Sequence, residues 1–416
     1  MRKNETTWDT SSVGDRRSTG KSFSFEQKLL YKLLQAAGDP PITVNLWDGT
    51  SITTSDAPQF ALTVDDRRAL WGLVSNPDLK LGELYTQGRV HIDGDLVAFL
   101  ETINQALPDF NQRWQSHRLL SKLYLLRRNT LDRARHNIYH HYDIGNDFYR
   151  LWLDEQMLYT CAYFPDPDLD LEQAQLAKMD HICRKLQLKS GDTVAEAGCG
   201  WGALALHMAR YYGVRVRAFN ISREQLAYAR QRAVELNLDD KIEFVEGDYR
   251  TIDGQYDVFV SVGMLEHVGV KQYPDLGEVM NRVLKPDGRG LVHSIGRNRP
   301  APMNAWIEKH IFPGAYPPSI SEAMMLFEPW RFSILDIENL RLHYAETLRQ
   351  WLLRFEAAAG RIETRFDAAF VRAWRFYLSG SIAAFTCGEL QLFQILFSRF
   401  DNNQIPFNRK FIYSEP

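Results

Sequence analysis

The hydrophobic pattern divides the chain into a front part and a longer second part. From about residue 23 to 107 the apolar residues form short strand-like runs, and the run at 42–47 ends in Asp48-Gly49, a strong turn signal. From residue 192 short apolar runs alternate with helical stretches, which is typical of a doubly wound parallel sheet. We therefore expect an α/β protein with a small N-terminal α+β domain.

The same pattern predicts the individual elements of the second part. We expect strands at residues 193–197, 214–219, 242–245, 257–262 and 290–294. A helix is expected at about 202–211, and Ser222 with Gln225 matches the capping box that opens another. The Lys285-Pro286-Asp287-Gly288 segment predicts a turn before the last strand.

Past residue 297 the pattern predicts helices and is dense in aromatic residues. We expect most of these in the core: Trp306, Phe312, Trp330, Trp351, Phe355, Phe366, Phe370, Trp374, Phe376, Phe385, Phe393 and Phe397.

Length and composition favour a globular protein with two domains. The 416 residues exceed one ordinary core, and 45% are hydrophobic against 24% charged. The formal charge of −3 gives no basic field for nucleic acid, which we do not expect as a partner. We expect a disordered tail at residues 1–22 and an N-terminal domain at 23–107. A basic linker helix at 108–138 and a large C-terminal domain at 139–416 follow.

The linker carries the one clear basic cluster. Between Arg113 and Arg135 there are seven lysine or arginine residues against one acid, Asp132. The cluster is either a solvated helix face or a surface for anionic lipid headgroups, and composition leaves both interpretations open.

The cysteines and the hydropathy of the chain indicate the cellular compartment in which we expect the protein. Cys161, Cys183, Cys199 and Cys387 lack metal-ligand spacing, so we expect no metal site, reduced thiols and a cytoplasmic location. The first 22 residues lack the apolar centre of a signal peptide, and no stretch approaches the roughly 20 apolar residues of a spanning helix. Any contact with a bilayer is therefore expected to be peripheral.

A glycine-rich loop follows the first predicted strand of the second part. Gly198, Gly200 and Gly202 stand between that strand and the next helix, where backbone N–H groups can face a ligand. The loop alone also matches the Gly-x-Gly-x-x-Ala motif of a nicotinamide dehydrogenase. Three residues argue against a dehydrogenase. Glu196 lies just before the loop, the second strand ends in Asn220 rather than in the acid expected for the ribose, and Asp248 follows the third strand.

The polar residues around the loop fit a cofactor with an amino acid end and an adenosine end, such as S-adenosylmethionine (SAM). Glu196 would pair with the α-ammonium group of SAM. Asp248 follows the third strand and, with Tyr249, would hold the adenine edge. The sequence therefore predicts that SAM binds at the glycine loop.

Five motifs follow one another along the second part. They are His141-Tyr142-Asp143-Ile144-Gly145-Asn146-Asp147-Phe148, Tyr159-Thr160-Cys161-Ala162-Tyr163-Phe164, Gly198-Cys199-Gly200-Trp201-Gly202, Ser261-Val262-Gly263-Met264-Leu265-Glu266-His267-Val268-Gly269 and His293-Ser294-Ile295-Gly296. Together they resemble the cyclopropane-fatty-acyl-phospholipid synthase family and the mycolic acid cyclopropane synthases, from about residue 138 to 400. In the front part, Gly82-Glu83-Leu84-Tyr85 and Asp93-Gly94-Asp95-Leu96 also resemble the longer bacterial members.

The resemblance implies a Rossmann-like class I methyltransferase sheet with helical additions that bind lipid, and an accessory lipid-binding domain in front of it. The family transfers a methylene group from SAM to the cis double bond of an unsaturated acyl chain. Because an alkene is a poor nucleophile, such a site must be dry and must hold the double bond against the sulfonium methyl. Aromatic faces would stabilise the resulting carbocation, and a base must then remove a proton so that the ring closes.

The resemblance further implies that this base is a bound bicarbonate ion. The residues that hold it in the family fall on Cys161, Glu266, His293, Ile295 and Tyr344, with Ile295 acting through its backbone N–H. Taken singly, these residues also suit structural roles, such as an inert buried thiol or a core histidine.

The cofactor contacts implied by the resemblance are Tyr159, Thr160, the loop from Glu196 to Gly202, Asn220, Ser222, Gln225, Asp248 and Tyr249. Two positions depart from the family pattern. Asn220 stands where threonine is usual, which keeps a hydrogen-bonding side chain near the ribose. Ser381 stands where many members have a cysteine, which argues that no covalent sulfur step is needed.

The resemblance to lipid-modifying enzymes makes unsaturated phospholipid the expected partner. The enzyme would reach it by peripheral association with the inner face of the membrane, and a homodimer is one option for assembly.

Three alternative functions stay open. Plant amine N-methyltransferases share the Glu266-His267 region, and a variant of the lipid reaction ends in a methylene or methyl branch. A non-enzymatic lipid-binding protein would explain the aromatic C-terminal half but not Glu196 and Asp248 at cofactor spacing.

Overall fold

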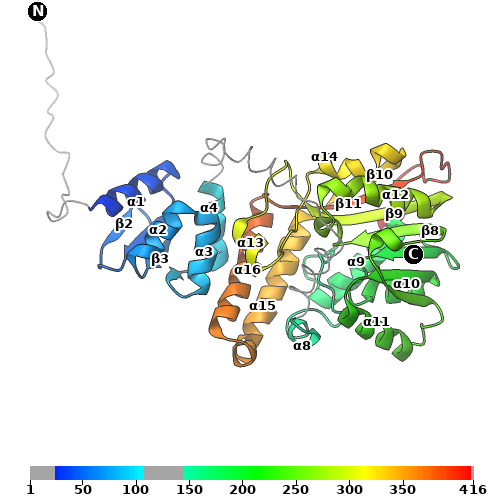
Figure 1. Cartoon of the computed structure of the whole chain (residues 1–416), viewed down its shortest axis with the longest axis horizontal. Coiled ribbons are helices and arrows are strands. Elements are labelled where there is room, and N and C mark those ends of the chain that lie inside the picture. Colours follow the sequence, from blue (N-terminus) through cyan, green and yellow to red (C-terminus); the bar gives the residue numbers. More distant parts are fainter. Residues whose placement is uncertain (1–23, 107–143, 414–416) are drawn as a thin grey trace, which may run out of the picture.

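The fold is taken from a computed structural model that describes residues 24–106 and 144–413. The predicted tail at 1–22 and the predicted basic linker helix at 108–138 lie outside the described residues, as do His141, Tyr142 and Asp143 of the first motif. Figure 1 shows the N-terminal elements at one end of the molecule, the large sheet at the other, and the long helices α15 and α16 between them.

The N-terminal unit is a four-stranded sheet with helices packed around it. Its elements are α1 (Phe25–Ala36), β1 (Ile42–Leu46), β2 (Ser51–Thr53), β3 (Phe60–Val64), α2 (Arg67–Ser75), α3 (Pro77–Thr86), β4 (Val90–Asp93) and α4 (Leu96–Ala106). The strand order is β2-β1-β3-β4, and the predicted Asp48-Gly49 turn joins the antiparallel strands β1 and β2. Gly49 adopts φ +82°, a left-handed conformation that suits glycine at this turn.

The large sheet has seven strands in the order β10-β11-β9-β8-β5-β6-β7. The strands are β5 (Thr193–Ala197), β6 (Arg215–Asn220), β7 (Ile242–Glu246), β8 (Tyr256–Val262), β9 (Leu284–Gly296), β10 (Ser333–Asn339) and β11 (Gln391–Ser398). The first five run parallel, while β11 is antiparallel to both β9 and β10. The predicted doubly wound α/β class is confirmed, and the strand order reverses between β5 and β8.

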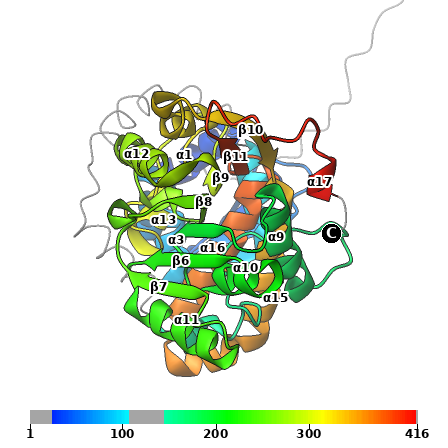
Figure 2. The same ribbon diagram turned by 90° about the vertical axis from the view of Figure 1, so that its right-hand side faces the viewer.

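Helices cover both faces of this sheet because its strands are apolar on both sides. Helices α9, α10 and α11 pack on one face, against residues such as Val194 and Val260, while α12 and α14 pack on the other, against Ala195 and Phe259 (Figure 2). These helices are α9 (Leu171–Lys185), α10 (Ala203–Tyr212), α11 (Arg223–Glu235), α12 (Tyr273–Val283) and α14 (Ile320–Ala323).

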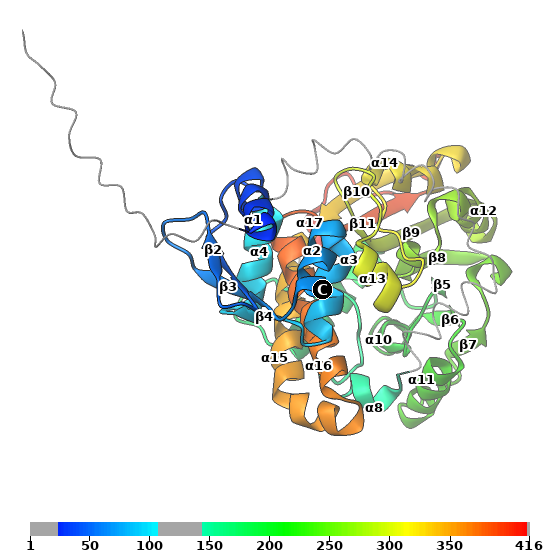
Figure 3. The ribbon, with the colours of Figure 1, turned by 60° about the vertical axis from the view of Figure 1, so that its left-hand side comes forward.

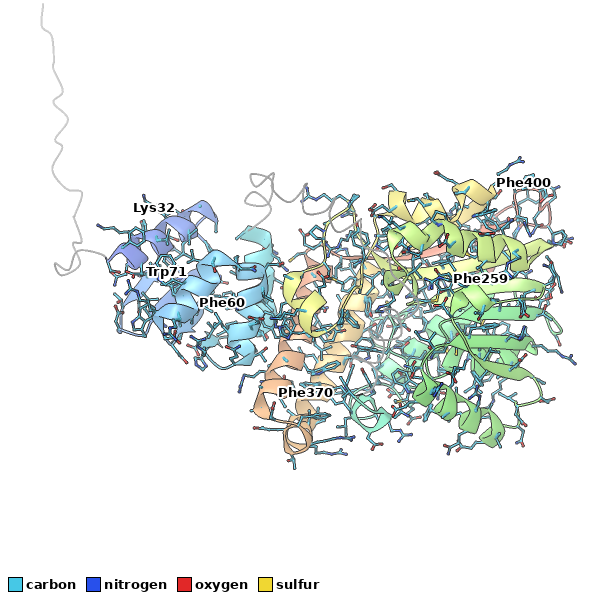
Figure 4. The ribbon with its side chains drawn as sticks, viewed as in Figure 1. Lys32, Phe60, Trp71, Phe259, Phe370 and Phe400 are labelled. Carbon is cyan, nitrogen blue, oxygen red and sulfur yellow. The ribbon has the colours of Figure 1, made fainter. Side chains whose placement is uncertain are left out.

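A third core, rich in aromatic rings, joins the sheet to the remaining helices. These are α8 (Asn146–Tyr149), α13 (Ala305–His310), α15 (Arg341–Arg365), α16 (Ala368–Thr386) and α17 (Lys410–Tyr413), and short 3₁₀ helices lie at Tyr249–Thr251, Leu265–His267, Val270–Gln272, Met324–Leu326 and Glu328–Trp330. None of the twelve aromatic residues named from the sequence is exposed. In Figure 4, Phe259 lies within the sheet and Phe370 on the helices beside it.

Three details of the sequence prediction are wrong. The region past residue 297 is not wholly helical, since β10 and β11 form two edge strands of the sheet. Residues 285–288 do not close a separate turn. They lie within β9 as an irregularity in its pairing with β8, because the strand begins earlier, at Leu284. Ser222 does cap α11, but the Gln225 side chain bonds Asn220 instead of completing the predicted box.

The Gly82-Glu83-Leu84-Tyr85 motif forms part of the contact between the two units, where α3 lies beside α13 (Figure 3) and α3 and α4 also contact α16. A Cβ atom on Gly82 would stand 2.6 Å from the Trp306 ring, so only glycine lets α3 approach this closely. Glu83 accepts hydrogen bonds from Lys309 and Lys80, and these bonds hold the pKa of its carboxyl at about 2. The motif therefore fixes the N-terminal unit to the helices of the larger one.

Gly82→Ala is expected to lower the free energy of unfolding by about 1–3 kcal/mol, because the added methyl group overlaps Trp306. Gly72→Ala, on the neighbouring helix α2, is the control. Its Cβ would meet ordinary contacts at 3.6 Å or more, so the better helix propensity of alanine should leave stability equal or higher. Denaturant unfolding followed by circular dichroism measures both changes, and equal stabilities for the two variants would contradict the close contact.

Candidate active site

The predicted site residues gather at the carboxyl ends of β5, β6, β8 and β9. Glu196 lies in β5, Asn220 ends β6, Glu266 follows β8 and His293 lies in β9. The strand order reverses between β5 and β8, and open α/β sheets bind ligands at such a reversal. The topology thus brings residues from separate motifs to one edge of the sheet.

The glycine loop has the backbone geometry of a ligand cradle. Gly198, Gly200 and Gly202 have φ values of +82°, +53° and +84°, which other residues rarely adopt. A Cβ on Gly202 would stand 2.8 Å from both Ala229 and Phe244, so this glycine lets helix α10 begin close to the sheet. A Cβ on Gly200 would meet nothing within 4 Å. The loop therefore leaves open space at the end of a helix, as SAM binding requires.

Glu196 is a buried carboxylate beside this loop. Its side chain is 3% exposed, and within residues 24–106 and 144–413 its Oε2 atom has no hydrogen-bond partner. Burial raises the pKa of Glu196 to about 8, and the positive charge of Lys178 opposes that rise. A carboxylate is costly to bury without a partner, so a cationic group such as the α-ammonium of SAM fits this position.

Asn220 ties the end of β6 to the glycine loop. Its Nδ2 donates to the Gly200 carbonyl at 3.1 Å and to Gln225 Oε1 at 2.8 Å, while its Oδ1 accepts from the N–H groups of Ile221 and Ser222. Asn220 thus orients the loop and the first turn of α11. This geometry favours a structural contribution of Asn220 to the cofactor site.

Asp248 and Tyr249 follow β7 at the same edge of the sheet. Asp248 is 8% exposed and caps the 3₁₀ helix, with its Oδ1 accepting from the Arg250 N–H at 3.0 Å. The Tyr249 hydroxyl accepts from Arg250 Nε at 3.2 Å. The proposed adenine contacts thus come from a short segment that its own hydrogen bonds hold in place.

Glu266, in the 3₁₀ helix that follows β8, and His293, in the neighbouring strand β9, each carry an unpaired polar atom. Glu266 Oε1 accepts from the Ile295 N–H at 2.5 Å, and burial raises the pKa of this carboxyl to about 7. The Gln394 amide nitrogen lies 3.1 Å from His293 Nδ1, and with this amide as the donor the proton of the neutral ring is on Nε2. Among the described residues, neither Glu266 Oε2 nor His293 Nε2 has a partner. Burial also holds the pKa of His293 well below its usual value, so the ring is neutral.

Cys161 and Tyr344 reach the same region through the backbone of Leu340. The Leu340 carbonyl accepts from the Tyr344 N–H at 3.1 Å and from the Cys161 thiol at 3.9 Å. The Leu340 N–H donates to Leu392, which pairs with Ile295 across β11 and β9. Burial raises the pKa of the Cys161 thiol, so it stays protonated. The structure thus brings Glu266, His293 and the Ile295 N–H together, whereas Cys161 and Tyr344 are related to them only through these main-chain contacts.

Aromatic rings surround Tyr159, which is predicted to contact the cofactor, and Tyr344, which is predicted to belong to the base site. The Tyr159 ring lies 5.3 Å from Trp152 and 5.2 Å from Trp351, centre to centre, and Trp351 also contacts Tyr344 at 6.0 Å. The hydroxyl groups of Tyr159 and Tyr377 are 2.9 Å apart. Aromatic faces of this kind can stabilise a nearby cation.

A buried lysine at this site was not predicted from the sequence. Lys178 of α9 is 1% exposed, and its Nζ donates to Thr160 Oγ1 at 2.7 Å. Its position three residues after Gln175 and four residues after Ala174, on the buried stripe of an amphipathic helix, was the available signal.

No helix in the described ranges is long and apolar enough to span a membrane. In the same part of the chain, no group of three or more His, Cys, Asp or Glu side chains is placed to hold a metal ion.

Comparison with known proteins agrees with this geometry. A family profile described as mycolic acid cyclopropane synthetase matches residues 129–395, and one described as a domain of unknown function matches residues 29–113. A probable fatty acid methyltransferase of Pseudomonas putida is 34% identical over 369 residues, which cover 86% of this chain and 91% of that protein. The cyclopropane-fatty-acyl-phospholipid synthase of Escherichia coli (strain K12) is 42% identical over 260 residues, or 62% of this chain and 66% of that protein.

Among solved structures, the mycolic acid cyclopropane synthase CmaA1 complexed with SAH and CTAB superposes with a TM-score of 0.61 and 29% identity. The match covers 64% of this chain and 98% of that one. The fold, the cofactor loop and these similarities agree, and they identify SAM as the methyl donor. The chain therefore belongs to the mycolic acid cyclopropane synthetase family and is a SAM-dependent methyltransferase of the cyclopropane-fatty-acyl-phospholipid synthase type.

Proposed function

We propose that this enzyme adds a methylene group from SAM across the cis double bond of unsaturated acyl chains in membrane phospholipids, with bicarbonate as the general base. The observation that carries the proposal is the pair of buried polar atoms without partners, Glu266 Oε2 and His293 Nε2, beside the Ile295 N–H. The name of the Escherichia coli relative supports the phospholipid substrate.

The residues around Glu266 suit a small oxygen anion. When bound, SAM supplies the sulfonium methyl group and bicarbonate supplies a base. The neutral His293 ring presents an Nε2–H donor, and Glu266, with its pKa near 7, can exchange a proton at neutral pH. Tyr344 and Cys161 complete the pocket, and the protonated thiol avoids placing a second negative charge beside the anion.

The aromatic cluster supports an alkene as the methyl acceptor. Methyl transfer to a double bond leaves a carbocation, and the faces of Tyr159, Trp152 and Trp351 lie close to one another and to the cofactor residues. The rings also exclude water, which would otherwise capture the cation.

An amphipathic cavity of about 610 Å³ between α3 and the helices α13 and α16 supports a lipid substrate. Its apolar lining consists of Ile144, Trp306, Ile311, Phe370, Ala373 and Trp374, and Glu83, Thr86, Gln87, Lys309 and His310 provide polar edges. From the cavity, Trp374 packs on Tyr377, whose hydroxyl meets that of Tyr159. We propose that part of the lipid lies in this cavity.

Ala373→Trp, which fills the cavity, is expected to lower kcat/KM for phosphatidylglycerol vesicles with unsaturated chains about tenfold. This corresponds to losing about 1.4 kcal/mol of apolar contact. The KM for SAM should not change. Ala369→Trp, on the same helix but outside the cavity lining, is the control and should behave like wild type. Equal lipid kinetics in both variants would remove the cavity from the proposal.

We also propose that the enzyme works in the cytoplasm, at the inner face of the membrane. A homodimer is one option for its assembly, and light scattering on the purified chain tests it. Arg150, Arg361 and Arg365 surround Asp147 at a surface hollow of about 510 Å³, and this excess of positive charge supports contact with anionic headgroups. Sedimentation with anionic and zwitterionic vesicles at low and high salt tests the association.

The function is tested by incubating the protein with labelled SAM and vesicles of unsaturated phospholipid and identifying the lipid product by mass spectrometry and NMR. The proposal expects cyclopropane rings in the acyl chains and a rate that depends on added bicarbonate. Label that appears only on small amines would overturn it.

A second candidate is methylation of the same double bond that ends in a methyl or methylene branch. The similarity to a probable fatty acid methyltransferase over 86% of this chain favours it. The same product analysis separates the two, because a branched chain and a cyclopropane ring give different NMR signals.

A further inference from the structure

Lys178 is a buried cation that the proposed chemistry does not use. It lies in the middle of α9 and is 1% exposed, although a lysine side chain is rarely buried without a paired charge. Its Nζ donates to Thr160 Oγ1 at 2.7 Å, and no other hydrogen bond to this ammonium is found among the described residues. An ammonium group has three donors, so a single neutral hydroxyl does not satisfy it.

Helix α9 holds the segment that contains Thr160 at two points. Three residues before Lys178, the Gln175 amide donates to the Thr160 carbonyl at 2.9 Å. The side chain and the main chain of Thr160 are therefore both fixed by one face of α9. Thr160 lies next to Tyr159 and Cys161, which belong to the cofactor and base sites proposed above.

The charged and titratable groups that face Lys178 come from several elements. Asp154 and Cys161 lie before and after residues 158–160, the segment that contains Thr160. Glu196 comes from β5 and His293 from β9. Burial lowers the pKa of Lys178 to about 8, while Asp154, Cys161 and Glu196 favour its charged form. Asp154 already accepts the N–H groups of Gln156 and Leu158. Glu196 is thus the carboxylate near Lys178 that still has an oxygen without a partner in the described structure.

The free-energy cost of burying the Lys178 ammonium group indicates that its charge has a function. Removing an ammonium group from water costs several kcal/mol, and a hydrogen bond to one hydroxyl does not repay it. A methionine at this position would fill a similar volume without that cost. The cation lowers the pKa of Glu196, but burial still holds that pKa at about 8, so the carboxyl becomes charged only when a second cation, such as the α-ammonium group of SAM, binds beside it.

We propose that Lys178 is a positioning residue for the amino acid end of SAM, because it fixes Thr160 and, together with the bound α-ammonium group, allows Glu196 to act as a carboxylate. This inference rests on the assignment of Thr160 and Glu196 to the cofactor site. It adds a residue that acts through others and does not itself contact the reacting carbon.

Calorimetric binding of two ligands to the full chain tests the proposal. SAM contains the amino acid end, whereas 5′-methylthioadenosine keeps the adenosine and lacks that end. Lys178→Met should weaken SAM binding about 10- to 100-fold and leave 5′-methylthioadenosine binding within about twofold of wild type. Equal losses for both ligands, or no loss for SAM, would overturn the proposal, since a merely structural role would not distinguish them.

Two further variants separate this inference from the site assignment. Glu196→Gln should cause the same selective loss of SAM binding, and the double variant Lys178→Met/Glu196→Gln should lose little more than either alone. Additive losses would show that Lys178 does not act through Glu196. Wild-type SAM affinity in Glu196→Gln would instead refute the cofactor-site assignment itself.

The smaller change Thr160→Val tests the same proposal if the Lys178→Met variant does not fold. It removes the hydroxyl that binds Lys178 Nζ while preserving the shape of the side chain. A several-fold loss of SAM binding with unchanged 5′-methylthioadenosine binding is expected. Loss of both ligands, or of neither, would contradict the proposal.

Discussion

Glu266→Gln is expected to lower the rate of methylene transfer about 10²- to 10⁴-fold, the usual contribution of an acid–base group, while SAM affinity stays near wild type. Glutamine keeps the size of the side chain and can still accept from the Ile295 N–H. It cannot exchange a proton, which the carboxyl can do at neutral pH because burial raises its pKa to about 7. Single-turnover rates with labelled SAM, together with calorimetric SAM binding, measure the two effects.

The pH dependence distinguishes this role from a structural one. In the wild-type enzyme the rate should fall as the pH drops through about 7, because the Glu266 carboxylate becomes protonated and can no longer accept a proton. The residual activity of Glu266→Gln should lack this step. Glu278→Gln, an exposed change of the same charge on α12, serves as the control. Wild-type turnover in Glu266→Gln would exclude Glu266 from the proposed base site.

Lys185→Met is expected to lower the free energy of unfolding by about 3–5 kcal/mol, as is typical when one partner of a buried ion pair is removed. Lys185 is fully buried in α9, and its Nζ lies 2.6 Å from Glu338 and 3.4 Å from Asp336 of β10. Methionine would leave both carboxylates without this cation. Denaturant unfolding at neutral pH measures the change, and Lys189→Met, at an exposed position, should be near neutral.

The ion pair between Lys185 and Glu338 also predicts that the free energy of unfolding falls at low pH. Burial would raise the pKa of Glu338, but hydrogen bonds from His181 and Lys185 and the charge of Lys185 hold it at about 2. A carboxyl whose pKa is lower in the folded protein contributes stability that is present above its unfolded pKa, near 4.5, and is lost as the pH falls toward 2. Glu338→Gln should reduce this loss, and an unchanged acid transition would argue against the pair.

Local patterns predicted the parallel strands, the glycine loop and the Ser222 cap correctly. Alternation of strands with helices reports burial on both faces of a sheet, and the spacing of Gly198, Gly200 and Gly202 reports backbone conformations that need glycine. The strands β10 and β11 were missed because a short apolar run such as 391–398 does not distinguish a strand from a buried helix.

The site residues also differ in whether local sequence patterns or only the tertiary structure place them. The strand ends placed Glu196 and Glu266 at one edge of the sheet, because carboxyl ends of parallel strands coincide. The proximity of Cys161 and Tyr344 was expected only from the family resemblance, and the contact that joins them passes through Leu340, which no local pattern marks. Likewise the Gln225 side chain bonds Asn220, a contact made across the turn after β6.

What the sequence by itself determined is therefore the doubly wound fold, the cofactor loop and the family, all of which depend on periodicity and on short motifs. The tertiary structure alone decided which polar groups lose water. Lys178, Glu196 and Glu266 become unusual only when the helices and sheet close around them, since burial sets their pKa values. Desolvation depends on packing between segments distant in the chain, and no single stretch of sequence encodes it.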